Sequence, residues 1–432
     1  LMAGEGYATK VSAGGTASAC QASRAPVIVF GAFDRHNFGD LLFPHIAAAL
    51  MPDRELIPAR LAERDLTACG GHRVAALADL AKQMSDVPVE ILHVGGELLT
   101  CDAWQAAVML TPPEEAQALI AKFADAPAAQ REWVHAQLGL PDRAPYVVSR
   151  YLFPCATRIV FTAVGWVGLF ESDPDLRDEV LAKLAAADAV SVRDAQTRAQ
   201  LDAAGIYATL VPDPAAMVAE LFGDHIDRQA RRDEVAQLRS SFPRGFIAVQ
   251  FSADFGDDAT LNALAAQLGR VTYETGLGIA LFRAGAATWH DDDAVYRRLS
   301  AHMHAGTTAL FTSLDLWDIC ALIAASRGYC GSSLHGRIVA MAYGLPRVNL
   351  IPPAEAGRAT KQAAYAATWE ADGLPHTVGV DEVAAGIFMA LRSESASRQA
   401  LARELEVRYR AGFAALLVRR QAVPARHLPP VG

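Results

Sequence analysis

Residues 330–337, with the sequence CGSSLHGR, bring together side chains that bind anions and move protons. Ser332 or Ser333 fits the N-cap of the helix that should follow, and the first-turn amides of a helix form an anion site. His335 adds proton-transfer capacity, and Arg337 adds positive charge. The segment therefore predicts a binding site for an anionic group, with His335 as an acid or base beside it.

Helical geometry limits how this site is built. Residues two positions apart project about 200° from each other around a helix, so His335 and Arg337 do not both face one ligand. Leu334 shares its face with Ile338 and Met341, which we expect to be buried. We predict that His335 contacts the ligand, with Arg337 as the second candidate. The alternative is that one of the two holds the loop in place.

Two further motifs lie where buried strands are expected to end. Asn37, Gly39 and Asp40 follow the first apolar run of the chain. Asparagine and aspartate are typical of helix starts, and glycine permits close approach of a backbone to a ligand. Gly95 and Gly96 repeat this pattern after the next clear strand. The alternative for both motifs is a tight turn without a ligand.

Charged residues mark the ends of three more expected strands. Arg193, in the sequence SVRD, stands where a guanidinium would bind phosphate or carboxylate through two parallel hydrogen bonds. The alternative is a structural pair with Asp194, whose position fits a helix cap. Asp213, in the sequence VPDPA, lies between a strand and a turn and is a candidate by position alone. Arg283 is a further cation at a strand end.

The elements between these motifs predict an α/β fold. Short apolar runs alternate with amphipathic stretches, and runs without polar alternation are typical of parallel strands covered on both faces. The rhythm breaks once and restarts, which predicts two doubly wound, Rossmann-like domains facing a cleft. The expected divisions are a disordered leader (1–25), an N-terminal α/β domain (26–223), a linker (224–245), a C-terminal α/β domain (246–380) and a helical tail (381–432).

Composition argues against several classes of protein. The length of 432 residues favours two domains, and the formal net charge of −9 argues against a nucleic-acid partner. The six cysteines show neither zinc-ligand spacing nor a disulfide framework, which suits the cytoplasm. The N-terminus lacks the apolar core of a signal peptide. The longest apolar run, residues 159–170, is too short to cross a membrane, so only a peripheral membrane contact stays open.

No metal site is expected. The sequence HDDD at 290–293 is the only candidate cluster, and it is more typical of a solvated helix cap.

In their order along the chain, these motifs resemble those of the polysaccharide pyruvyl transferase family. They are NFGD at 37–40, the glycine pair at 95–96, SVRD at 191–194, VPDP at 211–214, and SSLHGRI followed by GLP within 332–346. The resemblance runs from about residue 27 to residue 350. It implies a fold similar to the GT-B glycosyltransferases, with the acceptor on the N-terminal domain and the donor on the C-terminal domain. It also implies transfer of pyruvate from phosphoenolpyruvate to hydroxyls of a sugar residue, which gives a pyruvate ketal without a separate cofactor.

The resemblance implies roles for individual residues. In this family the Leu-His pair of the last motif, here Leu334 and His335, is associated with phosphoenolpyruvate binding, as are nearby arginines. We expect His335 to protonate the enol methylene, and Asp40 or Asp213 to deprotonate the acceptor hydroxyl. The other substrate-binding candidates are Asn37, Gly39, Gly95, Gly96, Arg193, Arg283, Ser332, Ser333 and Arg337.

The expected partners are phosphoenolpyruvate and a sugar or lipid-linked oligosaccharide of a cell-surface glycan or exopolysaccharide. The reaction would take place in the cytoplasm, with the inner face of the membrane as an option. Residues 52–88 and 111–157 should form much of the acceptor side, but they identify no particular sugar. Two alternatives stay open. One is a GT-B glycosyltransferase that uses a nucleotide sugar, and the other is a non-catalytic binding subunit of a polysaccharide assembly system.

Overall fold

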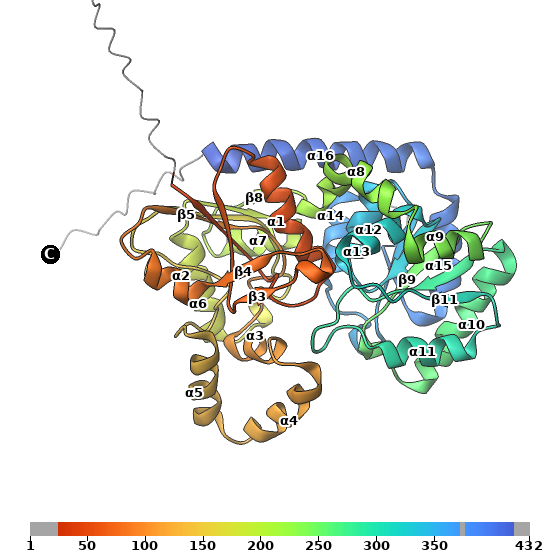
Figure 1. The fold of residues 1–432 in the computed structure, drawn as a ribbon, viewed down its shortest axis with the longest axis horizontal. Helices are drawn as coiled ribbons and strands as arrows, with labels where there is room; N and C mark the ends of the chain where they lie inside the picture. Colours follow the sequence, from red (N-terminus) through yellow and green to blue (C-terminus); the bar gives the residue numbers. More distant parts are fainter. Residues whose placement is uncertain (1–24, 372–375, 419–432) are drawn as a thin grey trace, which may run out of the picture.

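Helices and parallel strands alternate in both halves of the chain, because the buried apolar runs pair with one another and the amphipathic stretches cover them. The computed structural model describes residues 25–371 and 376–418. The predicted leader, residues 1–25, therefore lies almost wholly outside the described residues. Two lobes stand side by side, each with its own sheet (Figure 1). The expected pair of α/β domains is confirmed.

The first lobe contains a sheet in the order β3-β4-β2-β1-β5-β6-β7-β8. Its neighbouring strands are parallel, except that β3 pairs antiparallel with β4. The sequence predicted β1 and β5 to β8 but missed β2 to β4, which lie within residues 52–88. The strands are β1 (Val27–Phe30), β2 (Leu56–Arg60), β3 (Arg64–Asp65), β4 (Arg73–Ala76), β5 (Val89–His93), β6 (Ala156–Val164), β7 (Ala189–Val192) and β8 (Thr209–Leu210).

Helices of the first lobe follow these strands in sequence. Three of them, α3, α4 and α5, form an excursion that projects from the body of the lobe (Figure 1). The helices are α1 (Phe38–Leu50), α2 (Leu77–Gln83), α3 (Ala103–Met109), α4 (Pro113–Phe123), α5 (Pro127–Leu138), α6 (Pro174–Ala185) and α7 (Ala195–Ala203).

The second lobe contains a fully parallel sheet in the order β11-β10-β9-β12-β13-β14. Its strands are β9 (Phe246–Gln250), β10 (Gly278–Leu281), β11 (Thr308–Leu310), β12 (Gly328–Gly331), β13 (Arg347–Leu350) and β14 (Thr377–Val378). Its helices are α10 (Asp258–Thr275), α11 (Asp293–His302), α12 (Leu316–Ala325), α13 (Leu334–Ala342), α14 (Lys361–Trp369) and α15 (Val383–Arg392).

The segment 224–245, which we predicted to be a linker, is helical. It contains the end of α8 (Val218–Gln229) and all of α9 (Asp233–Ser241). Both helices pack against α12, and their buried residues belong to a core shared with the second lobe. The connection between the sheets is therefore packed structure instead of an extended tether, and the exact domain boundary stays a prediction.

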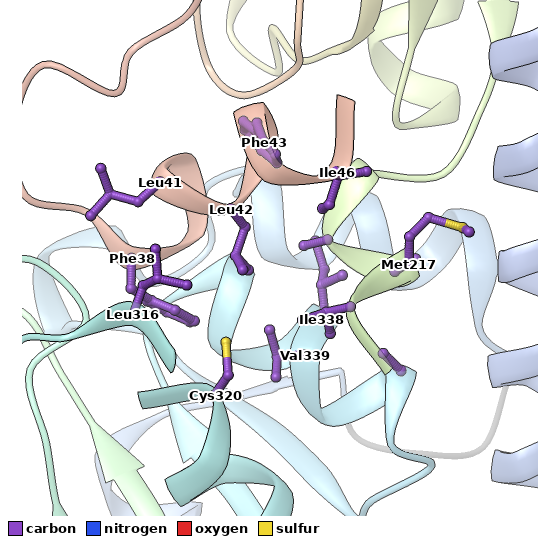
Figure 2. Packing of buried hydrophobic residues seen from close by; sticks show 14 of the residues in the cluster. Phe38, Leu41, Leu42, Phe43, Ile46, Met217, Leu316, Cys320, Ile338 and Val339 are labelled. Atoms are coloured by element: carbon purple, nitrogen blue, oxygen red, sulfur yellow. The ribbon is translucent and has the colours of Figure 1, made fainter. Parts of the chain in front are cut away.

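The two lobes share one apolar core. Helix α1 of the first lobe lays Phe38, Leu42 and Ile46 against α12 and α13 of the second lobe (Figure 2). Met217, in the short 3₁₀ helix η3 (Pro214–Met217), packs into the same cluster. A large apolar contact between domains fixes their relative position, so we expect the cleft between these lobes to be largely preformed.

A long final helix, α16 (Ser395–Val418), crosses both lobes (Figure 1). Near its start, Arg398 donates a hydrogen bond of 2.8 Å to the Gly344 carbonyl of the second lobe. Near its end, the carbonyls of Leu416 and Leu417 accept hydrogen bonds from Arg158 of the first lobe. The predicted tail therefore straps the lobes together as far as residue 418, and residues 419–432 lie outside the described part.

The longest apolar run, residues 159–170, begins in β6, an interior strand of the first sheet, and continues into the turn beyond it. Within residues 25–371 and 376–418, no helix has the length and apolar character that a membrane crossing requires.

Each sheet has a point where the strand order reverses. In the first sheet, β1 lies between β2 and β5, and in the second, β9 lies between β10 and β12. Ligands of open α/β sheets bind beyond the carboxyl ends of the strands at such points. The loops that follow β1, β5 and β12 carry three of the motifs found in the sequence, and they meet between the lobes.

Candidate active site

A cavity of about 440 Å³ lies where these loops meet. Both lobes line it, so the expected cleft is present. The sequence-predicted residues on its wall are Asn37, Asp40, Arg193, Ser332, Ser333, Leu334 and His335. Motifs separated by about 300 positions in the sequence therefore share one site.

The second lobe contributes the N-terminus of α13 to the cavity. Ser333 is its N-cap, because its hydroxyl accepts a hydrogen bond of 3.2 Å from the amide of Gly336. The carboxamide oxygen of Gln250, at the end of β9, accepts a hydrogen bond of 2.8 Å from the amide of Ser333. Among the described residues, the first-turn amides of Leu334 and His335 have no hydrogen-bond acceptor. The geometry matches that of a helix-terminus anion site.

The first lobe meets this helix at a glycine. A Cβ atom on Gly39 would lie 2.0 Å from Cγ of His335, so the imidazole rests directly on the backbone of α1. The ring of Phe43, one turn further along α1, meets the same imidazole edge-on at a centroid distance of 5.3 Å. Gly39 is therefore required for contact between the lobes, and the NFGD and SSLHG motifs form a single structure.

His335 is paired with a buried carboxylate. Its Nε2 lies 3.7 Å from Oδ2 of Asp213, and Nε2 is buried without a hydrogen-bond partner. The Asp213 side chain has no solvent exposure. Burial alone would raise the pKa of Asp213, but His335 and the positive charge of Arg193 outweigh it and hold the pKa below its ordinary value. The carboxylate is thus ionised and faces the imidazole.

Arg193 is held by carboxylates on two sides. Its Nη1 donates a hydrogen bond of 3.1 Å to Asp213, and its Nη2 pairs with Glu97. The other interpretation, a pair with Asp194, is not what the structure shows, because Asp194 instead caps α7 through the amide of Thr197. The guanidinium reaches the cavity, but its charge is largely matched by its two partners.

Asp40 lies on the cavity wall in the first turn of α1, and Asn37 is the N-cap of that helix. Burial raises the pKa of Asp40 above its ordinary value, with His335 and Arg35 opposing the shift. Gly95 and Gly96 have φ angles of 104° and 92°, which other residues rarely adopt. A Cβ atom on Gly96 would lie 3.2 Å from Oδ1 of Asp40, so this glycine lets the loop after β5 pass close to the carboxyl group.

Several predicted site residues do not line the cavity. Arg337 is fully buried on the opposite side of α13, where it pairs with Glu370. Arg283 lies at the end of β10 but is not part of the cavity wall. Gly39, Gly95, Gly96 and Asp213 are also absent from the wall, although they position residues that form it.

Sequence reasoning missed several polar residues of the cavity. Gln250 ends β9 and donates from Nε2 to the carboxylate of Asp291 at 2.9 Å. Burial raises the pKa of Asp291 to about 7. The sequence HDDD at 290–293 was interpreted as a solvated helix cap. Asp292 does cap α11, but His290 and Asp291 line the cavity. A strand ending in a polar amide was the available signal for Gln250.

Two cations on the wall were also missed. Arg35 precedes the NFGD motif and donates a hydrogen bond of 2.7 Å to the hydroxyl of Tyr146. Its Nε is buried without a partner. Lys361 begins α14 and is exposed. Neither residue stood out by spacing, because each reaches the site only through the fold. Within the described residues, no cluster of His, Cys, Asp and Glu is suited to hold a metal ion.

Solved structures share this architecture. The UDP-N-acetylglucosamine 2-epimerase of Rickettsia bellii aligns with 91% of this chain and 96% of its own length, at 10% identity and a TM-score of 0.52. The Neisseria meningitidis UDP-GlcNAc 2-epimerase bound to UDP-GlcNAc aligns over 91% and 99%, at 10% identity and a TM-score of 0.51. S. aureus MnaA with UDP aligns over 92% and 98%, at 12% identity and a TM-score of 0.51. At these identities the likeness shows the fold, which is GT-B.

Comparison with curated proteins finds no match. The polysaccharide pyruvyl transferase family model matches residues 138–352. The resemblance stated from the motifs is thereby confirmed over this range, which contains Arg193, Asp213 and His335. The motifs at 37–40 and 95–96 lie outside it, and they are linked to it through the cavity.

Proposed function

Because residues 138–352 match the polysaccharide pyruvyl transferase family, we propose that this chain transfers pyruvate from phosphoenolpyruvate to two hydroxyls of a glycan sugar. The observation that carries the proposal is His335 at the N-terminus of α13, backed by the ionised Asp213 and open to a cavity between the lobes. A proton donor beside an anion site is what an enol phosphate needs in order to react.

The donor's negative charges would be held at α13. Leu334, His335 and Ser332 line the cavity, as do the two cations Lys361 and Arg35. Arg193 contributes less than the sequence suggested, since Glu97 and Asp213 already balance its charge. The proposed donor site therefore depends more on helix amides and Lys361 than on Arg193.

The proton would come from His335. Its Nε2 lies 3.7 Å from Oδ2 of Asp213 and has no hydrogen-bond partner of its own. The buried carboxylate of Asp213 would hold the ring in position while the ring delivers a proton to the methylene carbon. Asp213 is fully buried behind the ring, so it acts through His335 and does not touch the acceptor.

Asp40 is the group placed to receive the acceptor's proton. Its carboxyl group lies on the cavity wall near His335, and its raised pKa makes it a stronger base than an exposed aspartate. The balance of the reaction is complete: two hydroxyls form bonds to C2, the bond from C2 to the phosphate oxygen breaks, and inorganic phosphate leaves. The two acceptor hydroxyls release two protons. One of them restores the proton that His335 gives to the methylene carbon, and the other leaves with the phosphate.

The acceptor is proposed to be a sugar of a cell-surface glycan or exopolysaccharide, free or lipid-linked, modified in the cytoplasm or at the inner face of the membrane. A nucleotide-sugar donor would require a pocket for a base and a ribose, and no observation on the described residues favours one.

The test uses purified protein with phosphoenolpyruvate and, separately, UDP-GlcNAc. We expect phosphoenolpyruvate to raise the melting temperature, and a suitable glycan to release phosphate while gaining a pyruvate ketal detected by mass spectrometry. Stabilisation by UDP-GlcNAc alone would favour a glycosyltransferase. If phosphoenolpyruvate gives neither stabilisation nor phosphate release with any acceptor, the proposal is wrong.

A further inference from the structure

The loop between β10 and α11 presents a tryptophan at the cavity. Trp289 lines the cavity and is 48% exposed. Its φ angle is 65°, in the left-handed region that bulky residues rarely occupy. A glycine or asparagine would adopt this conformation at lower cost, so neither packing nor backbone geometry explains an indole here.

The loop is held at many points, so it presents the indole in a fixed orientation. The amide of Ala284 donates to Asp291 at 2.6 Å, and the amide of Asp291 donates to the Gly285 carbonyl at 3.1 Å. His36 of the first lobe accepts a hydrogen bond of 3.1 Å from the amide of Ala286. A β-bridge between Asn37 and Gly285 joins the lobes at the same place.

The excursion of the first lobe approaches the loop from the opposite side. The hydroxyl of Thr288 donates to the carbonyl of Thr111, just beyond α3, at 3.4 Å. Gln105 and Met109 of α3 line the same cavity as Trp289. One part of the cavity is therefore bounded by an indole from one lobe and by a thioether and an amide from the other.

Polar groups follow Trp289 directly in the sequence. His290 and Asp291 line the cavity next to it. Burial, with help from the charge of Arg35, lowers the pKa of His290 to about 4, so the imidazole is neutral at physiological pH. An aromatic face beside neutral and acidic hydrogen-bonding groups suits a ring with one apolar C–H face and hydroxyls at its edge. A pyranose has this character, whereas a small trianion does not.

We propose that Trp289 is the platform of an acceptor subsite, on which a pyranose ring stacks with its hydroxyls directed toward the centre of the cavity. The inference rests on the proposed function for the identity of the chemistry, but the binding itself can be tested alone. The sequence placed the acceptor on the N-terminal domain, whereas this subsite would bind it through both lobes.

The test measures sugar binding without any reaction. The probes are methyl β-D-galactopyranoside, methyl β-D-glucopyranoside and, for a nucleotide, UMP, each followed by saturation-transfer NMR on the full chain. The variants are Trp289→Gly, which also relieves the left-handed backbone, and Trp289→Phe, which keeps an aromatic face. Tyr273→Ala is the control, because Tyr273 is 91% exposed on α10 and does not line the cavity.

We expect saturation transfer to at least one pyranoside in the native protein, a loss of fivefold or more in Trp289→Gly, and retention in Trp289→Phe and Tyr273→Ala. The melting temperature of Trp289→Gly should not fall. The proposal is overturned if the glycine variant keeps its signal, if only UMP binds, or if no pyranoside binds to the native protein.

The melting shift with phosphoenolpyruvate, recorded on the same samples, separates the two proposals. A normal phosphoenolpyruvate shift with no pyranoside signal means that the subsite is wrong and the donor site stands. A pyranoside signal that depends on Trp289, without a phosphoenolpyruvate shift, means the reverse.

Discussion

His335 and Arg337 occupy the same turn of α13, and the structure uses them in opposite ways. Both are buried. Arg337 is satisfied by Glu370 at 2.7 Å, by Asn349 at 3.0 Å and by the His376 carbonyl at 2.8 Å. Nε2 of His335 has no hydrogen-bond partner, although it lies near a carboxylate. A buried polar group whose partners are complete holds the fold, whereas one left incomplete beside a cavity is available for chemistry.

The buried ion pairs around Arg337 join the elements that lie behind the cavity. Glu370 accepts from both Arg337 and Arg347, and so joins α13, the start of β13 and the end of α14. Burial would raise the pKa of Glu370, but the two guanidinium groups outweigh it and keep the pKa below its ordinary value. The same cluster fixes α14, which begins with Lys361 on the cavity wall.

The largest effect on the transfer rate should come from His335, whose hydrogen bonding is incomplete. We expect His335→Gln to lower the rate of pyruvyl transfer by about 10² to 10⁴, the range that a positioned general acid contributes. Glutamine is preferred to alanine because the imidazole packs against Gly39 and Phe43, and truncation would open a void between the lobes. The rate is measured by phosphate release, and the melting temperature should change little. A variant that keeps more than a tenth of the rate would remove His335 from the chemistry.

Changes at Arg337 and its partners should lower the stability of the fold. Glu370→Ala would leave two buried guanidinium groups unpaired, and we expect a loss of about 3–5 kcal/mol in the free energy of unfolding. Chemical denaturation measures it. Glu404→Ala is the control, because Glu404 forms an exposed pair with Arg408 on α16, and such pairs contribute about 1 kcal/mol or less. Equal losses in the two variants would contradict a special role for the Arg337 cluster.

Gly39 lies where α1 of the first lobe meets His335 of the second lobe, and its substitution tests this contact. In Gly39→Ala the new Cβ would overlap the His335 ring, so the ring must move; we expect a cost of about 1–3 kcal/mol and a loss of transfer activity. Gly223→Ala is the matched control. Gly223 lies inside α8, and a Cβ added there would meet no atom within 4 Å, so alanine should be neutral or stabilising by up to about 1 kcal/mol. Full activity in Gly39→Ala would show that the contact between the motifs is dispensable.

The sequence predicted those features that follow from the spacing of apolar residues or from local helix geometry. The strands of both sheets that follow unbroken apolar runs were predicted, and so was the divergence of His335 from Arg337, because helical geometry dictates it. Glu370 could not be paired with Arg337 in advance, since only the packing of α14 brings them together. The helices within residues 224–245 were not predicted, because Ile226, Val235 and Leu238 are widely spaced among charged residues and only helical turns place them on a buried face.

The smallest predicted effect concerns a third polar group, which changes its charge near neutral pH. Asp291 has a pKa raised to about 7 by burial, so it is neutral below that pH and negative above it. A new negative charge on the cavity wall repels an anionic donor, so phosphoenolpyruvate affinity should fall as the pH rises through 7. Burial of this carboxyl group also makes its ionisation costly for the folded state, so its contribution to stability declines as the pH rises from about 4 to 7.

Asp291→Asn separates this charge from the titration of the donor itself. Native and variant proteins should bind phosphoenolpyruvate similarly at pH 6, whereas at pH 8 the variant should bind more tightly by roughly fivefold, which corresponds to about 1 kcal/mol of screened repulsion. Titration calorimetry at both pH values measures the difference. Because Asp291 also accepts hydrogen bonds from Gln250 and Ala284, denaturation curves must accompany the comparison. Parallel pH profiles for the two proteins would mean that Asp291 keeps one charge state throughout, and that its charge does not affect phosphoenolpyruvate binding near His335.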